Sequence, residues 1–146
     1  MNRKEGSIQS CSHVGDGFCP LVIRPGWQVS QLNDRADLHG NTIGQVERHA
    51  GSDEVFVLVK GRAILVSARE RANALDCDVQ PMTAGVVYTV PQGVWHTIVT
   101  FPEMLVVIVE KDNTHLHDVA YRTLTKEERL ALREKLECGT DGESHA

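Results

Sequence analysis

The sequence predicts an all-β fold, a jelly-roll barrel followed by a short C-terminal helix. Its middle consists of short runs rich in valine, isoleucine and threonine, separated by glycine and proline residues. Two of these runs, residues 55–59 and 104–109, are apolar on both faces of the expected strand. A helical pattern appears only after residue 125. The length of 146 residues indicates one domain that can bury its own core.

The composition excludes several classes of protein. A net charge of −5 argues against a nucleic-acid partner. No apolar run approaches the roughly 20 residues that span a bilayer, and no apolar stretch follows the basic residues near the N-terminus, so we expect neither a membrane span nor a signal peptide. The four cysteines have no framework spacing, which indicates reduced thiols and a cytoplasmic protein.

The candidate site residues come from two stretches of the chain. In the first, Glu47 and His49 are two positions apart, so their side chains share one face of a strand. Glu54 opens the next strand after a short turn. In the second stretch, the turn Pro91-Gln92-Gly93 delivers His96 onto a further strand. Two imidazoles and two carboxylates on neighbouring strands suit one divalent cation.

These two stretches resemble the paired motifs of the cupin family. The first motif ends in His-x-His, a glutamate and a glycine at fixed spacing; His49, Glu54 and Gly61 match it, and Glu47 replaces the first histidine. The second motif runs from a glycine through Pro-x-Gly to a histidine and an asparagine. Four of its five positions match and the last is a threonine, as the following residues show: Gly85, Pro91, Gly93, His96 and Thr100.

The resemblance implies a cupin-type double-stranded β-helix with a metal in its mouth, as in small single-domain bacterial members of the family. The implied ligands are Glu47, His49, Glu54 and His96, and the metal is a divalent transition metal, Fe, Mn, Ni, Zn or Co. For Glu47 an alternative stays open, in which its carboxylate pairs with an arginine or reaches solvent at the barrel mouth.

The domain boundaries follow from the same reading. We expect a flexible arm at 1–20, the barrel at 21–122, a helix at 123–138 and a disordered tail at 139–146. Residues 55–59 and 62–68 are predicted to form a hairpin, 69–81 a polar loop, and 110–118 a loop in which His115 and His117 are solvated. Thr125 and Glu128 form the capping box that opens the helix.

Partners are predicted from the apolar strands. Strands that are apolar on both faces need cover on the outside, from a second sheet or from another subunit. The family's habit of pairing through its outer sheet favours a homodimer. Inside the barrel, Tyr88, Phe56 and Ile98 are candidate contacts for a small-molecule ligand, although Tyr88 also suits a packed aromatic position.

Three functions are compatible with these residues. The first is a metal-dependent enzyme of isomerase, lyase or dioxygenase type that acts on a small polar organic substrate, with Glu47 transferring a proton. The second is a non-catalytic module that binds or senses a small molecule. The third, a structural or storage barrel, is disfavoured by the four polar positions that face inward.

Overall fold

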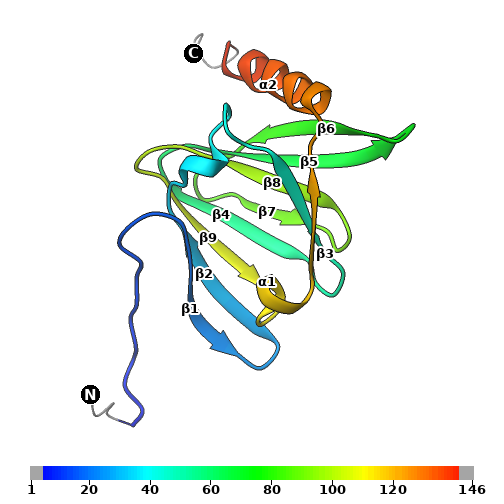
Figure 1. Cartoon of the computed structure of the whole chain (residues 1–146). Coiled ribbons are helices and arrows are strands. Elements are labelled where there is room, and N and C mark those ends of the chain that lie inside the picture. Colours follow the sequence, from blue (N-terminus) through cyan, green and yellow to red (C-terminus); the bar gives the residue numbers. More distant parts are fainter. Residues whose placement is uncertain (1–4, 142–146) are drawn as a thin grey trace.

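The computed structural model describes residues 5–141 and contains two antiparallel sheets of five strands (Figure 1). In spatial order, the first sheet consists of β1 (Phe18–Arg24), β2 (Trp27–Leu32), β9 (Leu105–Glu110), β4 (Glu54–Lys60) and β7 (Val87–Val90). The second consists of β10 (Val119–Thr123), β3 (Gln45–His49), β8 (Trp95–Thr100), β5 (Ala63–Arg71) and β6 (Ala74–Pro81). The helices are η1 (Ala36–Leu38), α1 (Thr114–His117) and α2 (Lys126–Asp141). The predicted all-β fold with a C-terminal helix is confirmed.

Two hydrophobic clusters hold the layers together. The first fills the barrel interior, where Phe56 and Ile108 of one sheet share a cluster with Ile98 of the other. The second lies outside the second sheet, where Val99 and Leu132 share a cluster beneath α2. Figure 1 shows α2 lying across β6. Neighbouring residues on β8 point to opposite faces of the sheet, so Ile98 belongs to the first cluster and Val99 to the second.

The start of α2 is fixed by the predicted capping box. The Glu128 backbone N–H donates to Thr125 Oγ1 at 3.1 Å, and the Thr125 N–H donates to Glu128 Oε1 at 2.9 Å. Glu128 also accepts hydrogen bonds from the Leu75 N–H and from Arg122. Burial opposes the charge of Glu128, but these hydrogen bonds outweigh it and lower its pKa to about 2. One carboxylate therefore ties α2 to both β6 and β10.

The hairpin predicted across Lys60 and Gly61 is wrong. β4 pairs with β9 and β7, whereas β5 pairs with β6 and β8, so the two strands lie in different sheets. Gly61 has φ +77°, and a Cβ there would lie 2.7 Å from the Cα of Met104. Only glycine fits this turn, which carries the chain from one sheet to the other.

The polar loop predicted at 69–81 is also wrong. β5 continues to Arg71, and Ala72 and Asn73, with φ 47° and 68°, turn the chain directly into β6. On β6 the buried Leu75 and Cys77 alternate with exposed residues. Because only every second residue is apolar, this strand resembles a polar loop in sequence.

Several boundaries differ from the prediction. β1 begins at Phe18, so the last residues of the predicted arm belong to the barrel. α2 continues through Gly139 to Asp141, because one glycine costs a helix only about 1 kcal/mol. The rest of the predicted tail, 142–146, lies outside the described residues. The four cysteines are unpaired, as predicted, and no helix of the described part has the length and apolar character to cross a membrane.

Candidate metal centre

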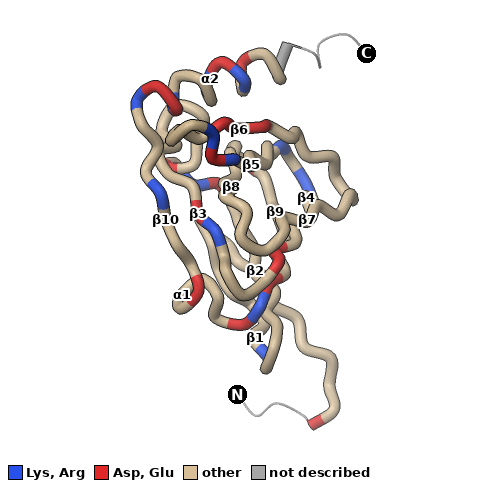
Figure 2. Tube along the Cα trace, turned by 90° about the vertical axis from the view of Figure 1, so that its right-hand side faces the viewer, with Lys and Arg blue, Asp and Glu red and all other residues tan. Residues whose placement is uncertain are grey.

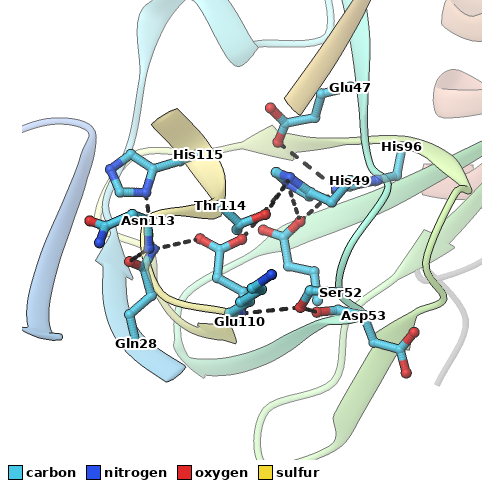
Figure 3. Close-up of polar contacts among 12 residues, drawn as sticks. Gln28, Glu47, His49, Ser52, Asp53, His96, Glu110, Asn113, Thr114 and His115 are labelled. Carbon is cyan, nitrogen blue, oxygen red and sulfur yellow. Dashed lines mark hydrogen bonds and ion pairs between the residues drawn. The ribbon is translucent and has the colours of Figure 1, made fainter. Parts of the chain in front are cut away.

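The four side chains predicted as metal ligands converge inside the barrel, and Figure 3 labels Glu47, His49 and His96 among them. Glu47 and His49 come from β3, Glu54 is the first residue of β4, and His96 lies on β8 directly opposite Glu47. Each residue offers one ligand atom, and these atoms all lie within 4.8 Å of one another. The period of two along β3 and the pairing of β3 with β8 bring them together.

Glu54 is the centre of this cluster. Its Oε2 lies 2.8 Å from Nε2 of His96 and 3.2 Å from Nε2 of His49. These three side chains are at most 6% exposed. Glu47 is different: its side chain is 35% exposed, and its Oε1 lies 3.9 Å from Nε2 of His96. The site therefore has a buried core of three residues and a fourth residue on its open side.

The outer nitrogens of both imidazoles are engaged by other groups. His96 Nδ1 donates to the Val94 carbonyl at 3.0 Å, and His49 Nδ1 lies 3.2 Å from Thr114 Oγ1. In neutral His96 this leaves the Nε2 lone pair against the Glu54 carboxylate. Two lone pairs at that distance need a proton or a cation between them. Nitrogen and oxygen donors in this arrangement fit a divalent transition metal.

In the metal-free protein, protons on the two histidines supply the positive charge that a metal ion would bring. Burial disfavours the charged form of His49, but the hydrogen bond and charge of Glu54 outweigh it and raise the pKa of His49 to about 9. The pKa of His96 is also raised, against burial, by Glu54. Burial likewise opposes ionisation of Glu54, yet both histidines hold the pKa of its carboxyl below the ordinary value. A metal must displace these protons in order to bind.

Glu110, at the end of β9, is a site residue that the sequence analysis missed. Its side chain is 2% exposed, and its Oε2 has no hydrogen-bond partner and lies 3.7 Å from Nε2 of His49. Burial, reinforced by the charge of Glu54, raises the pKa of Glu110 to about 7. An orphaned buried oxygen aimed at the cluster is what a bound cation would satisfy.

The position of Glu110 in the sequence indicates that its side chain points into the barrel. It shares the inward face of β9 with Ile108, at the end of an apolar run. The loop predicted at 110–118 begins at this residue, whereas the period of two along the strand places its side chain inside the barrel.

The cluster opens into a cavity of about 670 Å³. Phe56 and Ile98, which were predicted as ligand contacts, line this cavity. Tyr88 does not line it; it lies opposite Phe56 in the first sheet, and its hydroxyl accepts a hydrogen bond from the Thr83 N–H at 2.8 Å. Tyr88 is therefore a packed aromatic residue, the alternative that its sequence position left open.

The residues that line the cavity include Tyr121 and His115. Tyr121, on β10, lies opposite Glu47 at the exposed side, and the burial of Tyr121 together with the charge of Glu47 raises its pKa. His115 of α1 lines the cavity from another side. The prediction that His115 is solvated is therefore wrong, whereas His117 is exposed as predicted.

Comparisons with known proteins support the fold. No protein-family model matches this sequence, and no curated protein matches it. A double-stranded β-helix protein of unknown function from Klebsiella pneumoniae has a similar structure, with 13% identity, a TM-score of 0.54, and coverage of 86% of this chain and 100% of that one. A variant of Streptomyces PAC13 with uridine has 16% identity, a TM-score of 0.53, and coverage of 80% and 88%.

A cupin-like protein from Thermotoga maritima is also similar, with 18% identity, a TM-score of 0.49, and coverage of 77% of this chain and 80% of that one. Sequence identities this low show that the folds are similar, and they do not show that the reactions are. The strand order of the two five-stranded sheets agrees with the neighbour of TM-score 0.54, a double-stranded β-helix protein. The protein therefore has the double-stranded β-helix fold.

Proposed function

We propose that this protein binds one divalent transition metal through Glu47, His49, Glu54 and His96, and that it is an isomerase or lyase acting on a small polar organic substrate. The observation that carries the proposal is the convergence of four ligand atoms within 4.8 Å at the side of an open cavity. The similar PAC13 structure contains uridine, which is consistent with a small polar ligand.

The chain's own residues suit proton-transfer chemistry at this site. A bound metal would supply Lewis-acid polarisation of a substrate oxygen. Glu47, on the exposed side, is free to turn away and admit that oxygen, or to move a proton itself. Glu110, whose Oε2 lies 3.7 Å from Nε2 of His49, adds a further carboxylate beside the site. A redox-neutral reaction uses these groups, so it is favoured over dioxygenase chemistry.

A second candidate function is a metal-independent module that binds or senses a small molecule. It is favoured by the hydrogen bonds that Glu54 accepts from protonated His49 and His96, which satisfy these three residues without a cation. Oxygen uptake distinguishes dioxygenase chemistry from both of these functions, because an iron-loaded dioxygenase would consume oxygen when it turns over substrate.

Elemental analysis of protein purified without a metal-affinity tag tests the proposal. We expect about one transition metal per chain in the native protein and almost none in His49→Ala. His117→Ala is the matched control, because it removes an exposed histidine of the same chain. A native protein that takes up no metal from Fe, Mn, Ni, Co or Zn solutions would contradict the metal site and leave the binding module as the function.

We also propose that the protein is a homodimer formed through the outer face of the first sheet. Val57, Val107 and Val87 lie side by side on that face, and Val87 is 64% exposed. Charged residues in β9, β4 and β7 occur only at strand ends, so the middle of this sheet is uncharged (Figure 2). The second sheet has α2 as its cover, and a second copy of the chain would cover the first.

The mass of the protein in solution checks this prediction. Multi-angle light scattering is expected to give a dimer for the native chain and a monomer for the Val57→Lys/Val107→Lys double variant, with an unchanged circular-dichroism spectrum. Leu130→Lys, at an apolar position of α2 that is 50% exposed, should remain dimeric. A native protein that is monomeric at micromolar concentration would be incompatible with the dimer.

A further inference from the structure

His115 faces the cavity but belongs to no part of the proposed metal site. It lies in the short helix α1 and lines the cavity wall. The edge of the Phe18 ring packs against the imidazole, with 5.3 Å between ring centroids. His115 Nδ1 lies 3.1 Å from Nε2 of Gln28, as Figure 3 shows.

Gln28 is fully buried on β2, and its amide can adopt only one orientation. Its Oε1 accepts the Asn113 backbone N–H at 2.8 Å, so its NH₂ group faces the other way. The two hydrogens then point to Glu110 Oε1 at 2.9 Å and to His115 Nδ1 at 3.1 Å. A flipped amide would lose the backbone hydrogen bond and set an oxygen against the Glu110 carboxylate.

This orientation fixes the tautomer of His115. An amide nitrogen only donates, so Nδ1 must accept and the proton of the neutral ring is on Nε2. An imidazolium would place an N–H against an N–H. Burial and the neighbouring His49 both lower the pKa of His115, in keeping with a neutral ring. Within residues 5–141, the hydrogen bond of the His115 ring is made by Nδ1 and none engages Nε2.

We propose that His115 binds a ligand in the cavity by donating its Nε2–H to a carboxylate or carbonyl oxygen, and that Gln28 is the positioning residue that fixes this tautomer. The inference rests on the proposed function, because the ligand is the one that binds beside the metal centre. It adds a recognition residue on a different element from the metal ligands.

His115 is connected to the cluster through buried side chains and shares its cavity. Gln28 bonds to both His115 and Glu110, and Glu110 Oε2 lies 3.7 Å from the ring of His49. His115 and the four residues of the metal site also line one cavity, so a ligand in that cavity can contact both. Two arginines, Arg129 and the Asp37-paired Arg35, also line this cavity, and together with a bound metal they would offset its carboxylates toward an anionic ligand. Malonate, a small dicarboxylate, is the probe we choose.

The tautomer is measured without any ligand, by nitrogen-15 NMR of histidine-labelled protein at neutral pH. The His115 signals are assigned by their loss in His115→Phe. We expect a neutral ring with the proton on Nε2, and a mixture of tautomers in Gln28→Met, which removes the amide but keeps its length. A native ring that is protonated on Nδ1, or is cationic, would overturn the role of Gln28.

Ligand binding is measured by titrating malonate into zinc-loaded protein. His115→Phe keeps an aromatic ring against Phe18 and is expected to weaken malonate binding about tenfold, with zinc affinity unchanged. His117→Phe should behave as the native protein does. Equal malonate affinity in His115→Phe, or no malonate binding by the native protein, would overturn the inference. If zinc itself fails to bind, the metal site has failed, and the same titration on the metal-free protein still decides the role of His115.

Discussion

Replacement of Glu54 by glutamine is expected to weaken binding of a divalent metal by at least about 100-fold. Glu54 is the residue whose carboxylate contacts both His49 and His96, at 3.2 Å and 2.8 Å. The amide keeps the shape but removes the negative charge, and its NH₂ group repels a cation. Competition with a chromophoric chelator at neutral pH measures the affinity.

Glu47→Gln is the matched comparison, because it makes the same chemical change at the open side of the cluster. Glu47 is 35% exposed and lies 3.9 Å from His96, so its loss should weaken the metal by about tenfold or less. The ratio of the two effects separates a buried anchoring ligand from an exchangeable one. An equal loss in both variants would show that Glu47 is an anchoring ligand too, contrary to our expectation.

The core of the candidate site could be predicted because two short motifs resemble those of a known family, although the pairing of β3 with β8 is what brings the two motifs together. Glu47 and His49 share a face of β3 through the period of two, and Gly93 sets the turn before His96. The Gly93 N–H donates to the His49 carbonyl at 2.8 Å, so this turn is anchored on the strand that carries the other ligands. The local geometry within each motif can therefore be predicted without knowledge of the tertiary structure.

The other site residues depend on strand pairing between distant segments. Gln28 and Glu110 are opposite each other in the register of β2 and β9, more than half the chain apart. No local pattern reveals that register, so neither residue could be linked to His49 or His115 from the sequence. The wrong hairpin between residues 55–59 and 62–68 has the same origin. Two neighbouring apolar runs look like a hairpin, and only the pairing of each strand elsewhere shows that they lie in different sheets.

Glu110→Gln is expected to stabilise the metal-free protein at alkaline pH. The pKa of Glu110 is raised from 4.5 to about 7, mainly by burial. At about 1.4 kcal/mol for each pKa unit, ionised Glu110 lowers the free energy of unfolding by roughly 3 kcal/mol above pH 7. Glutamine keeps an oxygen for the hydrogen bond from Gln28 and removes the buried charge. Urea unfolding of chelator-treated protein across a pH series measures the difference.

The pH dependence has a definite sign. Below pH 4.5 the Glu110 carboxyl is protonated in both the folded and the unfolded chain, so the two proteins should have similar stability. Between pH 4.5 and about 7 only the unfolded chain releases this proton, so the native protein loses stability relative to the variant as the pH rises. With metal bound the order should reverse, since the variant lacks a negative charge beside the cation. A variant that is less stable than the native protein at pH 8 without metal would contradict the assignment of Glu110 as a carboxylate that awaits a cation.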